Sequence, residues 1–193
     1  QMALADYYLQ ISRRGYLKKI RTALTASIMG NKFIGTGVKV PGDQTMDLTL
    51  RKADDRFVLI SYEGYIQGIP AKMLPYAIVE AMRLGNSDHL VAALSVSNRK
   101  SILVMTQIGK IIHRTADSLE MATDLKRKGR MLYSTARRER GVRVIGAAAV
   151  DQSDYGLALH QEGLVSLHSV AGLLNSGTLT TESELLEFIT FSA

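Results

Sequence analysis

The stretch Val58-Leu-Ile-Ser-Tyr-Glu-Gly64-Tyr-Ile decides the fold, because variants of it occur four times along the chain. Each variant is a short apolar run, a polar turn closed by Gly, and a second run that begins at once. The other three are Tyr8-Leu-Gln-Ile-Ser-Arg-Arg-Gly15-Tyr-Leu, Leu103-Val-Met-Thr-Gln-Ile-Gly109-Lys-Ile-Ile and Leu157-Ala-Leu-His-Gln-Glu-Gly163-Leu-Val. The glycines are separated by 49, 45 and 54 residues, which indicates a repeat architecture. Gly in the turn favours a β-hairpin, since it adopts positive φ without a steric cost.

The repeat extends beyond its hairpin. Nine or ten residues after each of these glycines comes a leucine: Leu24, Leu74, Leu119 and Leu173. A less regular connection leads to a third strand-like run, at residues 45–50, 90–96, 144–150 and 185–191. Each unit therefore has three or four short strands, the size of a propeller blade, which must stack on its neighbours to bury both faces.

The sequence therefore predicts an all-β fold, a β-propeller or β-pinwheel built from four repeats. We expect one domain over residues 1–193, with repeat units at about 1–55, 56–100, 101–153 and 154–193. A β-sandwich and a closed barrel also contain many short strands, but neither requires near-equal repeats. Absence of Trp excludes the usual tryptophan–aspartate repeat.

Two segments interrupt the β pattern. Residues 71–84 have apolar side chains at helical spacing, with Pro75 early in the segment. Residues 115–128 have acids in the first turn and end before Gly129. Each pattern leaves a short amphipathic helix and an irregular loop open as alternatives.

Charge is distributed unevenly along the chain. Residues 1–143 hold all 24 Lys and Arg and 12 of the 18 acids, a net charge of +12, whereas residues 144–193 hold six acids and no Lys or Arg. This asymmetry favours an anionic partner for the first three repeats and not for the fourth. The alternative is that these cations only protect exposed strand edges from aggregation.

Catalytic and cofactor chemistry find little support in the sequence. No cysteine is present, which excludes disulfides and thiolate metal sites. The four histidines are dispersed, and only His160 and His168 are placed to face each other across the last hairpin. Gly35-Thr-Gly37 lacks the strand–loop–helix context of a phosphate loop. We expect no catalytic residue, no metal and no cofactor, and no apolar run approaches the roughly 18 residues that span a membrane.

One period of the sequence, from Gly37 to Leu74, resembles a known family. It reads Gly37-Val-Lys-Val-Pro-Gly-Asp-Gln-Thr-Met-Asp-Leu-Thr-Leu, then an acidic turn, then Phe57-Val-Leu-Ile-Ser-Tyr-Glu-Gly64-Tyr-Ile-Gln-Gly-Ile-Pro-Ala-Lys-Met-Leu74. This order is similar to one period of the C-terminal β-propeller (β-pinwheel) of the A subunit of DNA gyrase and of topoisomerase IV. The stretch from Gly141-Val-Arg-Val-Ile-Gly to Gly163-Leu-Val-Ser-Leu fits as well, and the resemblance covers almost the whole chain.

The resemblance implies a domain that is not catalytic by itself and that binds and bends double-stranded DNA. Its implied partners are DNA and, in a full-length enzyme, the cleavage core and the B subunit of an ATP-dependent type II topoisomerase. Its implied location is the cytoplasm of a bacterial-type cell, at the nucleoid, without a membrane. The predicted DNA-binding residues lie in or beside the repeat turns: Arg13, Arg14, Lys18, Lys19, Arg21, Arg99, Lys100, Arg114, Lys126, Arg127, Lys128, Arg130, Arg137, Arg138, Arg140 and Arg143.

The chain departs from the family pattern in three ways. The gyrase box, Gln-Arg-Arg-Gly-Gly-Lys-Gly, is absent, and Arg137-Arg-Glu-Arg-Gly-Val-Arg143 is the nearest stretch. In the family that box is tied to the introduction of negative supercoils, so the resemblance is greater to the topoisomerase IV type or to a divergent gyrase paralogue. The family domain has five or six blades where this chain has four periods, and its basic residues stop at Arg143. A protein-interaction propeller whose acidic last repeat docks a partner is the alternative function, and a small-ligand or sugar-binding propeller is a third.

Overall fold

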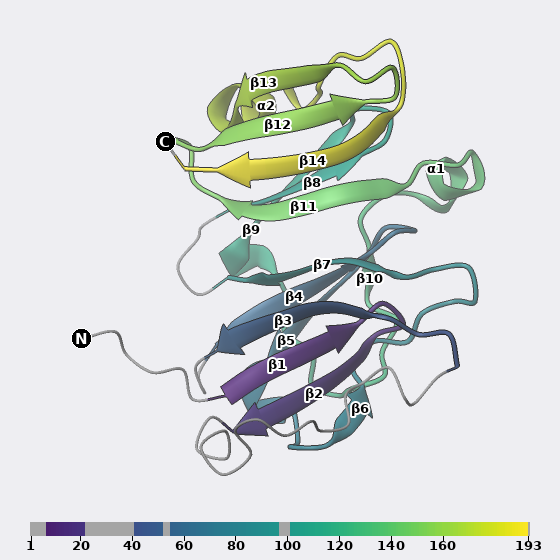
Figure 1. The fold of residues 1–193 in the computed structure, drawn as a ribbon, viewed down its shortest axis with the longest axis vertical. Coiled ribbons are helices and arrows are strands. Elements are labelled where there is room, and N and C mark those ends of the chain that lie inside the picture. The colour runs from purple at the N-terminus through teal and green to yellow at the C-terminus, as the bar shows by residue number, and fades with distance from the viewer. Residues whose placement is uncertain (1–6, 22–40, 52–54, 97–100, 193) are drawn as a thin grey trace.

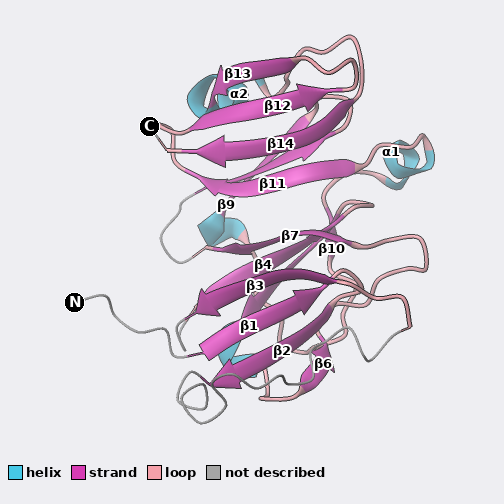
Figure 2. Ribbon diagram, in the orientation of Figure 1, coloured by secondary structure: helices cyan, strands magenta, loops and turns pink. Residues whose placement is uncertain are grey.

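Four small antiparallel sheets stack along the longest axis of the molecule (Figures 1 and 2). This is a computed structural model, and it describes residues 7–21, 41–51, 55–96 and 101–192. The predicted all-β fold of four repeats is confirmed, because each repeat contributes the hairpin and the third strand of one sheet. Leu24 and residues 35–37 lie outside the described residues.

The sheets are numbered in chain order, and their strands follow in spatial order. The first sheet is β3 (Thr45–Arg51), β1 (Tyr7–Ser12), β2 (Tyr16–Arg21) and β6 (Ile78–Glu80). The second is β10 (Arg130–Met131), β5 (Tyr65–Pro70), β4 (Arg56–Ser61) and β7 (Leu90–Ser95). The third is β11 (Val144–Val150), β8 (Ser101–Thr106) and β9 (Ile111–Thr115). The fourth is β13 (Val165–Ser169), β12 (Tyr155–His160) and β14 (Leu185–Phe191).

The hairpin turns have the backbone conformation that their sequence predicts. Gly15, Gly64, Gly109 and Gly163 have φ of 89°, 94°, 82° and 89°. A side chain at such a φ is strained, so Gly keeps each turn tight. This places the two strands of every hairpin in the same register relative to its glycine.

Each repeat after the first returns a segment to the hairpin of the repeat before it. β6 pairs with β2, β10 pairs with β5, and Lys110 and Thr178 form an antiparallel bridge beside β9. In each case a backbone N–H donates to the carbonyl oxygen of a hairpin glycine: Ala81 to Gly15 at 2.9 Å, Leu132 to Gly64 at 2.7 Å, and Leu179 to Gly109 at 2.7 Å. We call residues 78–82, 130–133 and 178–179 the returning segments. They link consecutive sheets along their outer strands.

The sequence left a helix open as an alternative at residues 71–84 and 115–128. Neither segment is an α-helix: only the short 3-10 turns Ala71–Met73 and Ala116–Ser118 form, and the chain then runs into β6 and β10. Pairing with another repeat satisfies the backbone N–H and C=O groups of these segments. The spacing of apolar residues along the sequence does not reveal such pairing. Two α-helices of the described residues lie elsewhere, at α1 (Thr135–Glu139) and α2 (Val170–Ser176), each begun by a serine that caps its N-terminus.

Three apolar cores lie between consecutive sheets. Side chains alternate along each central strand, so Leu59 packs toward the first sheet while Val58 and Ile60 pack toward the third. The third core joins the third and fourth sheets through Leu103, Leu173 and their neighbours. The repeated leucines Leu74 and Leu173 are buried, and Leu119 packs at the edge of the second core.

A matched pair of glycine substitutions measures the role of a returning segment. A Cβ on Gly109 would lie 2.0 Å from the carbonyl oxygen of Leu179, whereas a Cβ on Gly163 meets nothing within 4 Å. Both residues have positive φ, so both Gly→Ala variants carry a similar conformational cost of about 1 kcal/mol. We expect Gly109→Ala to lower the free energy of unfolding by roughly 1–3 kcal/mol more than Gly163→Ala, measured by denaturant titration. Equal losses would contradict this role.

Candidate nucleic-acid interface

Residues 119–131 form an outer connector that runs along the outer strand of the second sheet. The N–H of Ala122 donates to the carbonyl oxygen of Gly68 at 2.7 Å, beside a parallel bridge between Gly68 and Met121. Further along, the N–H of Arg83 donates to the carbonyl oxygen of Arg127 at 3.0 Å. The connector therefore contacts both β5 and the returning segment that covers the first sheet.

Two glycines allow this close approach. A Cβ on Gly68 would lie 2.7 Å from Cε of Met121, and one on Gly129 would lie 2.6 Å from the carbonyl oxygen of Ile66. Gly129 has φ of 88° and Lys126 has φ of 65°, so the connector turns sharply on either side of the basic run. The backbone thus holds the connector flat against the sheet, and its basic side chains face solvent.

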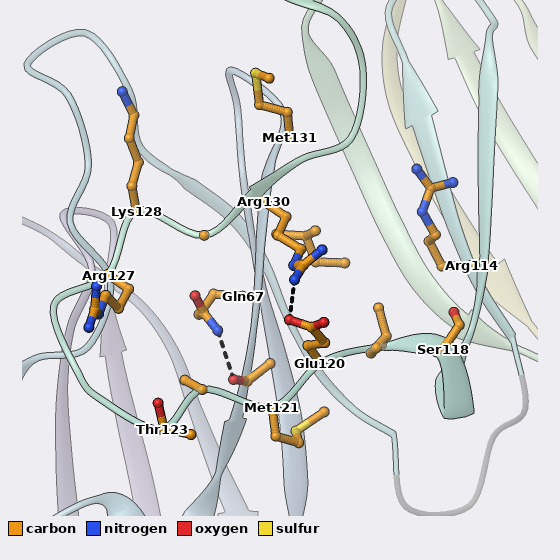
Figure 3. A pocket seen from close by; sticks show the side chains of 15 residues that line it. Gln67, Arg114, Ser118, Glu120, Met121, Thr123, Arg127, Lys128, Arg130 and Met131 are labelled. Carbon is orange, nitrogen blue, oxygen red and sulfur yellow. Dashed lines mark hydrogen bonds and ion pairs between the residues drawn. The ribbon is translucent and has the colours of Figure 1, made fainter.

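The outer connector carries the densest set of exposed cations. Lys126, Arg127, Lys128 and Arg130 are all exposed. Arg127, Lys128 and Arg130 border a groove of ≈ 790 Å³ between β5 and the connector, and Arg114 of β9 also lines it. In the view of Figure 3, Arg127 and Lys128 lie on one side of this groove and Arg114 on the opposite side.

Two arginines of the connector are paired with acids of the same connector. Arg127 forms an ion pair with Asp124 at 2.7 Å, and Arg130 forms one with Glu120. All four side chains are about two-thirds exposed. Exposed pairs of this kind contribute about 0.2–1 kcal/mol, so a phosphate can displace either carboxylate at small cost.

One aromatic ring joins the two basic segments that the sequence identified. Nζ of Lys128 lies 4.8 Å and Cζ of Arg138 lies 4.4 Å from the centroid of the Tyr65 ring. The Nε–H of Arg138 also donates to the carbonyl oxygen of Glu63 at 3.0 Å. Residues 126–130 and α1 are therefore neighbours, and Arg137 and Arg140 are exposed on and beside α1. Tyr65 itself is buried, with 9% of its surface exposed.

Lys19 makes its contacts inside the protein. It is 7% exposed, and its Nζ donates to the carbonyl oxygens of Ala71 at 3.3 Å and Leu74 at 3.4 Å. The same Nζ lies 4.9 Å from the Tyr7 ring centroid and 4.7 Å from that of Tyr76. This lysine therefore bonds the first sheet to the 3-10 turn of the second repeat.

Arg14 and Arg143 also bond to backbone carbonyls. The guanidinium of Arg14 donates to the carbonyl oxygens of Gly85 and Asp88. That of Arg143 donates to the carbonyl oxygens of Arg138 and Val142, each at 2.8 Å. A sequence pattern does not separate such arginines from solvent-facing ones, because both kinds sit in polar turns.

The remaining predicted cations either lie in the first repeat or fall outside the described residues. Arg13 and Arg21 are exposed, and Lys18 is half-buried. Cζ of Arg21 lies 4.4 Å from the centroid of the exposed Tyr76 ring, so Tyr76 contacts two of the three β2 cations, Lys19 and Arg21. Arg99 and Lys100 lie outside the described residues.

The two histidines of the fourth sheet meet at one hydroxyl. Nε2 of His160 and Nε2 of His168 each lie 2.7 Å from Oγ of Ser166, and Nδ1 of His160 lies 2.9 Å from Oγ1 of Thr181. Burial, with a smaller contribution from His160, lowers the pKa of His168. Among the described residues no three His, Asp or Glu side chains group as metal ligands, and no helix is long and apolar enough to cross a membrane.

Tyr133 closes the junction beneath the basic segments. Its ring occupies the space where a Cβ of Gly64 would lie, and its hydroxyl donates to the carbonyl oxygen of Val142 at 2.8 Å. Burial raises the pKa of Tyr133 to about 12, against the smaller opposing effects of Arg143 and Arg138. The sequence offered no signal for this residue, because its role depends on the missing side chain of Gly64.

The pKa of Tyr133 makes stability depend on alkaline pH. Because the pKa is raised in the folded state, the neutral phenol contributes stability that is present below the unfolded value of 10.0 and lost as pH rises through about 12. We expect the free energy of unfolding to fall over this window more steeply in the unsubstituted protein than in Tyr133→Phe, followed by denaturant titration. Parallel pH profiles would contradict the buried phenol.

The chain was compared with known protein families, with curated proteins and with solved structures. No protein-family model and no curated protein matches the sequence. The structure, however, has the fold of the C-terminal domains of the A subunits of bacterial type II topoisomerases. It matches the C-terminal domain of DNA topoisomerase IV with a TM-score of 0.81 and 19% identity, over 100% of this chain and 64% of that one.

Two further solved structures share the fold. The C-terminal domain of Escherichia coli ParC gives a TM-score of 0.74 with 14% identity, over 97% of this chain and 82% of that one. The C-terminal domain of DNA gyrase A gives 0.67 with 14% identity, over 99% of this chain and 67% of that one. The chain thus spans just under two thirds of the topoisomerase IV structure. At these identities the fold is shared, which agrees with the β-pinwheel that the sequence predicts.

Proposed function

We propose that this chain is a non-catalytic accessory domain of a type II DNA topoisomerase that binds duplex DNA and bends it along the outer edge of its first three sheets. One observation carries the proposal: the outer connector holds exposed cations at that edge, whereas the fourth sheet carries no Lys or Arg. The fold shared with topoisomerase IV and gyrase A C-terminal domains supports the same assignment.

The physics of phosphate binding suits this edge. Lys and Arg contact phosphates without reading the base sequence and release the counterions condensed on DNA. We assign the contacts to the exposed cations of the connector and α1, together with Arg13, Arg21 and the half-buried Arg114. Lys19, Arg14 and Arg143 instead hold the edge in shape through their carbonyl contacts. Bending a site of 20–30 base pairs costs about 1–6 kcal/mol, which additional contacts along a curved edge offset.

Cleavage and religation of DNA would belong to other parts of the enzyme. The domain would act in the cytoplasm at the nucleoid, and it would present one DNA segment to the cleavage core of an A subunit that works with an ATP-hydrolysing B subunit. The lack of a gyrase box in this sequence supports a parent of the topoisomerase IV type over a gyrase. This agrees with a TM-score of 0.81 for topoisomerase IV against 0.67 for gyrase A.

Salt dependence tests the electrostatic basis of binding. Each phosphate neutralised adds about 0.9 to the slope of log affinity against log salt. With five or more of the exposed cations engaged, we expect a slope steeper than about −4 and little change between duplexes of unrelated sequence. Fluorescence anisotropy with short duplexes measures both. Absence of binding at low salt would overturn the proposal.

Reversal of the connector charges tests where DNA binds. The triple variant Lys126→Glu, Arg127→Glu, Lys128→Glu removes three exposed cations. It should weaken duplex binding at least about tenfold, because three phosphate contacts are lost. The free energy of unfolding should change little, since these side chains face solvent. An unchanged affinity would show that the connector is only a solvated edge.

A charge-balanced variant separates position from total charge. Adding Glu182→Lys, Glu184→Lys and Glu187→Lys to the triple variant restores the original net charge, and all three glutamates are exposed in the fourth repeat. Binding should stay weak, because the added cations lie in the fourth repeat, away from the connector. Full recovery of the affinity would indicate that DNA responds to net charge alone.

A further inference from the structure

A second pocket, of ≈ 410 Å³, lies between the third hairpin turn and α1, and we call it the α1 pocket. In Figure 1, α1 lies at the side of the molecule, before the start of β11. The pocket shares no lining residue with the groove beside the outer connector. Its apolar lining comes from Ile108, Ile112, Val142 and the ring of Tyr133. Ligand sites in proteins range from about 300 to 1,000 Å³, so a pocket of this volume suits a small ligand.

Hydrogen bonds fix the walls of the α1 pocket. In the hairpin turn, Nε2 of Gln107 donates to the carbonyl oxygen of Gly141 at 2.5 Å, and its Oε1 accepts the N–H of Arg143 at 2.7 Å. The N–H of Gln107 also donates to the carbonyl oxygen of Arg143 at 3.0 Å. The start of α1 is held by Ser134, whose Oγ accepts the N–H of Arg137 at 3.3 Å. The pocket is therefore preformed, which lowers the entropic cost of binding a ligand.

Ile108 places an apolar side chain where the other repeats place a charge. The residue before the hairpin glycine is Arg14, Glu63 and Glu162 in those repeats. Ile108 is 54% exposed, at the mouth of the α1 pocket. An apolar ligand that covered this side chain would remove its surface from water, which is favourable.

Three cations without an acidic partner surround the apolar lining. Lys110, Arg137 and Arg140 line the pocket, and all three are exposed. None of them forms an ion pair with a described acid, and no acid lines the pocket. In this they differ from Arg127 and Arg130 of the connector, each of which is paired with a carboxylate. The rim of the α1 pocket therefore attracts an anionic group.

The lining offers few hydrogen bonds to a ligand. Thr106 and Tyr133 are its uncharged polar residues. Each already donates its hydroxyl hydrogen, Thr106 to the carbonyl oxygen of Lys110 at 2.9 Å and Tyr133 to that of Val142 at 2.8 Å. A sugar or a nucleobase buried here would leave polar groups unpaired, which is unfavourable. A stable protein partner buries about 800 Å² on each side, which a pocket for one small ligand does not supply.

We propose that the α1 pocket binds a small amphiphilic anion, a molecule with an acyl chain or aryl ring that carries a carboxylate or phosphate. The chain or ring packs against Ile108 and Ile112. The anionic group lies at the rim, between Lys110 and the two arginines of the pocket. The proposed function assigns Arg137 and Arg140 to DNA phosphates. On that assignment, on which this part of the inference rests, a bound anion neutralises both arginines and weakens duplex binding.

Octanoate is a probe of this chemistry, because it joins a carboxylate to an apolar chain. Titrated into the full chain with isotope-labelled isoleucine methyl groups, it should shift the NMR signals of Ile108 and Ile112 saturably, with a Kd below about 1 mM. Ile189, 52% exposed on the fourth sheet, should not shift and is the internal control. Acetate has the charge without the chain, and octanol has the chain without the charge, so each should bind at least about tenfold more weakly.

Two matched pairs of variants locate the ligand. Ile108→Asp places a carboxylate against the apolar chain and should weaken octanoate binding at least about tenfold, read at the Ile112 methyl signal. Leu167→Asp, at a 63% exposed position on the fourth sheet, should leave it unchanged. Lys110→Ala removes one cation of the rim and should weaken octanoate binding about threefold. Lys72→Ala, at an exposed lysine away from the pocket, should not.

Competition with DNA is read in a separate titration. Saturating octanoate should lower the affinity for a short duplex at least about threefold relative to the same concentration of acetate, because two phosphate contacts are masked. Ile108→Asp should abolish this difference. If the chain bound no duplex at all, the proposed function would fail, while the methyl titration would still test the pocket.

Three results would overturn the inference. The first is the absence of saturable shifts at Ile108 and Ile112 with millimolar octanoate. The second is equal octanoate binding by Ile108→Asp and by the unsubstituted chain. The third is a duplex affinity that octanoate and acetate lower equally, because the anion would then act through ionic strength alone.

Discussion

The arrangement of this protein depends on one backbone contact, the hydrogen bond from a returning segment to the carbonyl oxygen of a hairpin glycine. It occurs at Gly15, Gly64 and Gly109, and each time it fastens one repeat to the sheet before it. A sheet of three or four strands buries little apolar area alone, so its stability comes from its neighbours. The contact sets the distance at which neighbouring sheets pack their cores.

The same contact places the candidate DNA-binding surface. Because the third repeat must reach back to Gly64, its connector crosses the outer edge of the second sheet. The basic run of that connector is then exposed on the outside of the molecule, and α1 follows beside it through Tyr65. Positioning of charge is in this sense a consequence of how the repeats are joined.

The fourth repeat differs from the others in its charge and in its packing. It keeps the hairpin, the third strand and the core toward the third sheet. Its opposite face is apolar and acidic at the rim, and no described segment returns to Gly163. The change from basic to acidic along the chain therefore coincides with the loss, among the described residues, of the contact between a returning segment and the hairpin glycine.

Local patterns were sufficient for the hairpins, the third strands and the number of repeats. Alternation of apolar residues and a glycine with positive φ are short-range requirements, so they are visible in the sequence. Residues 71–84 and 115–128 were ambiguous for the opposite reason. Their backbones pair or form bridges with segments of another repeat, and this partner is distant in sequence.

For the predicted cations too, the sequence shows one part and only the tertiary structure shows the rest. The sequence identified which residues are basic and where they concentrate, and by itself it determined the repeat and the unequal charge of its copies. Only the tertiary structure separated the exposed Lys126 and Lys128 from the buried Lys19, whose ammonium bonds to carbonyls more than 50 residues away. Composition and period are properties of the chain, whereas exposure depends on which distant segments pack around a side chain.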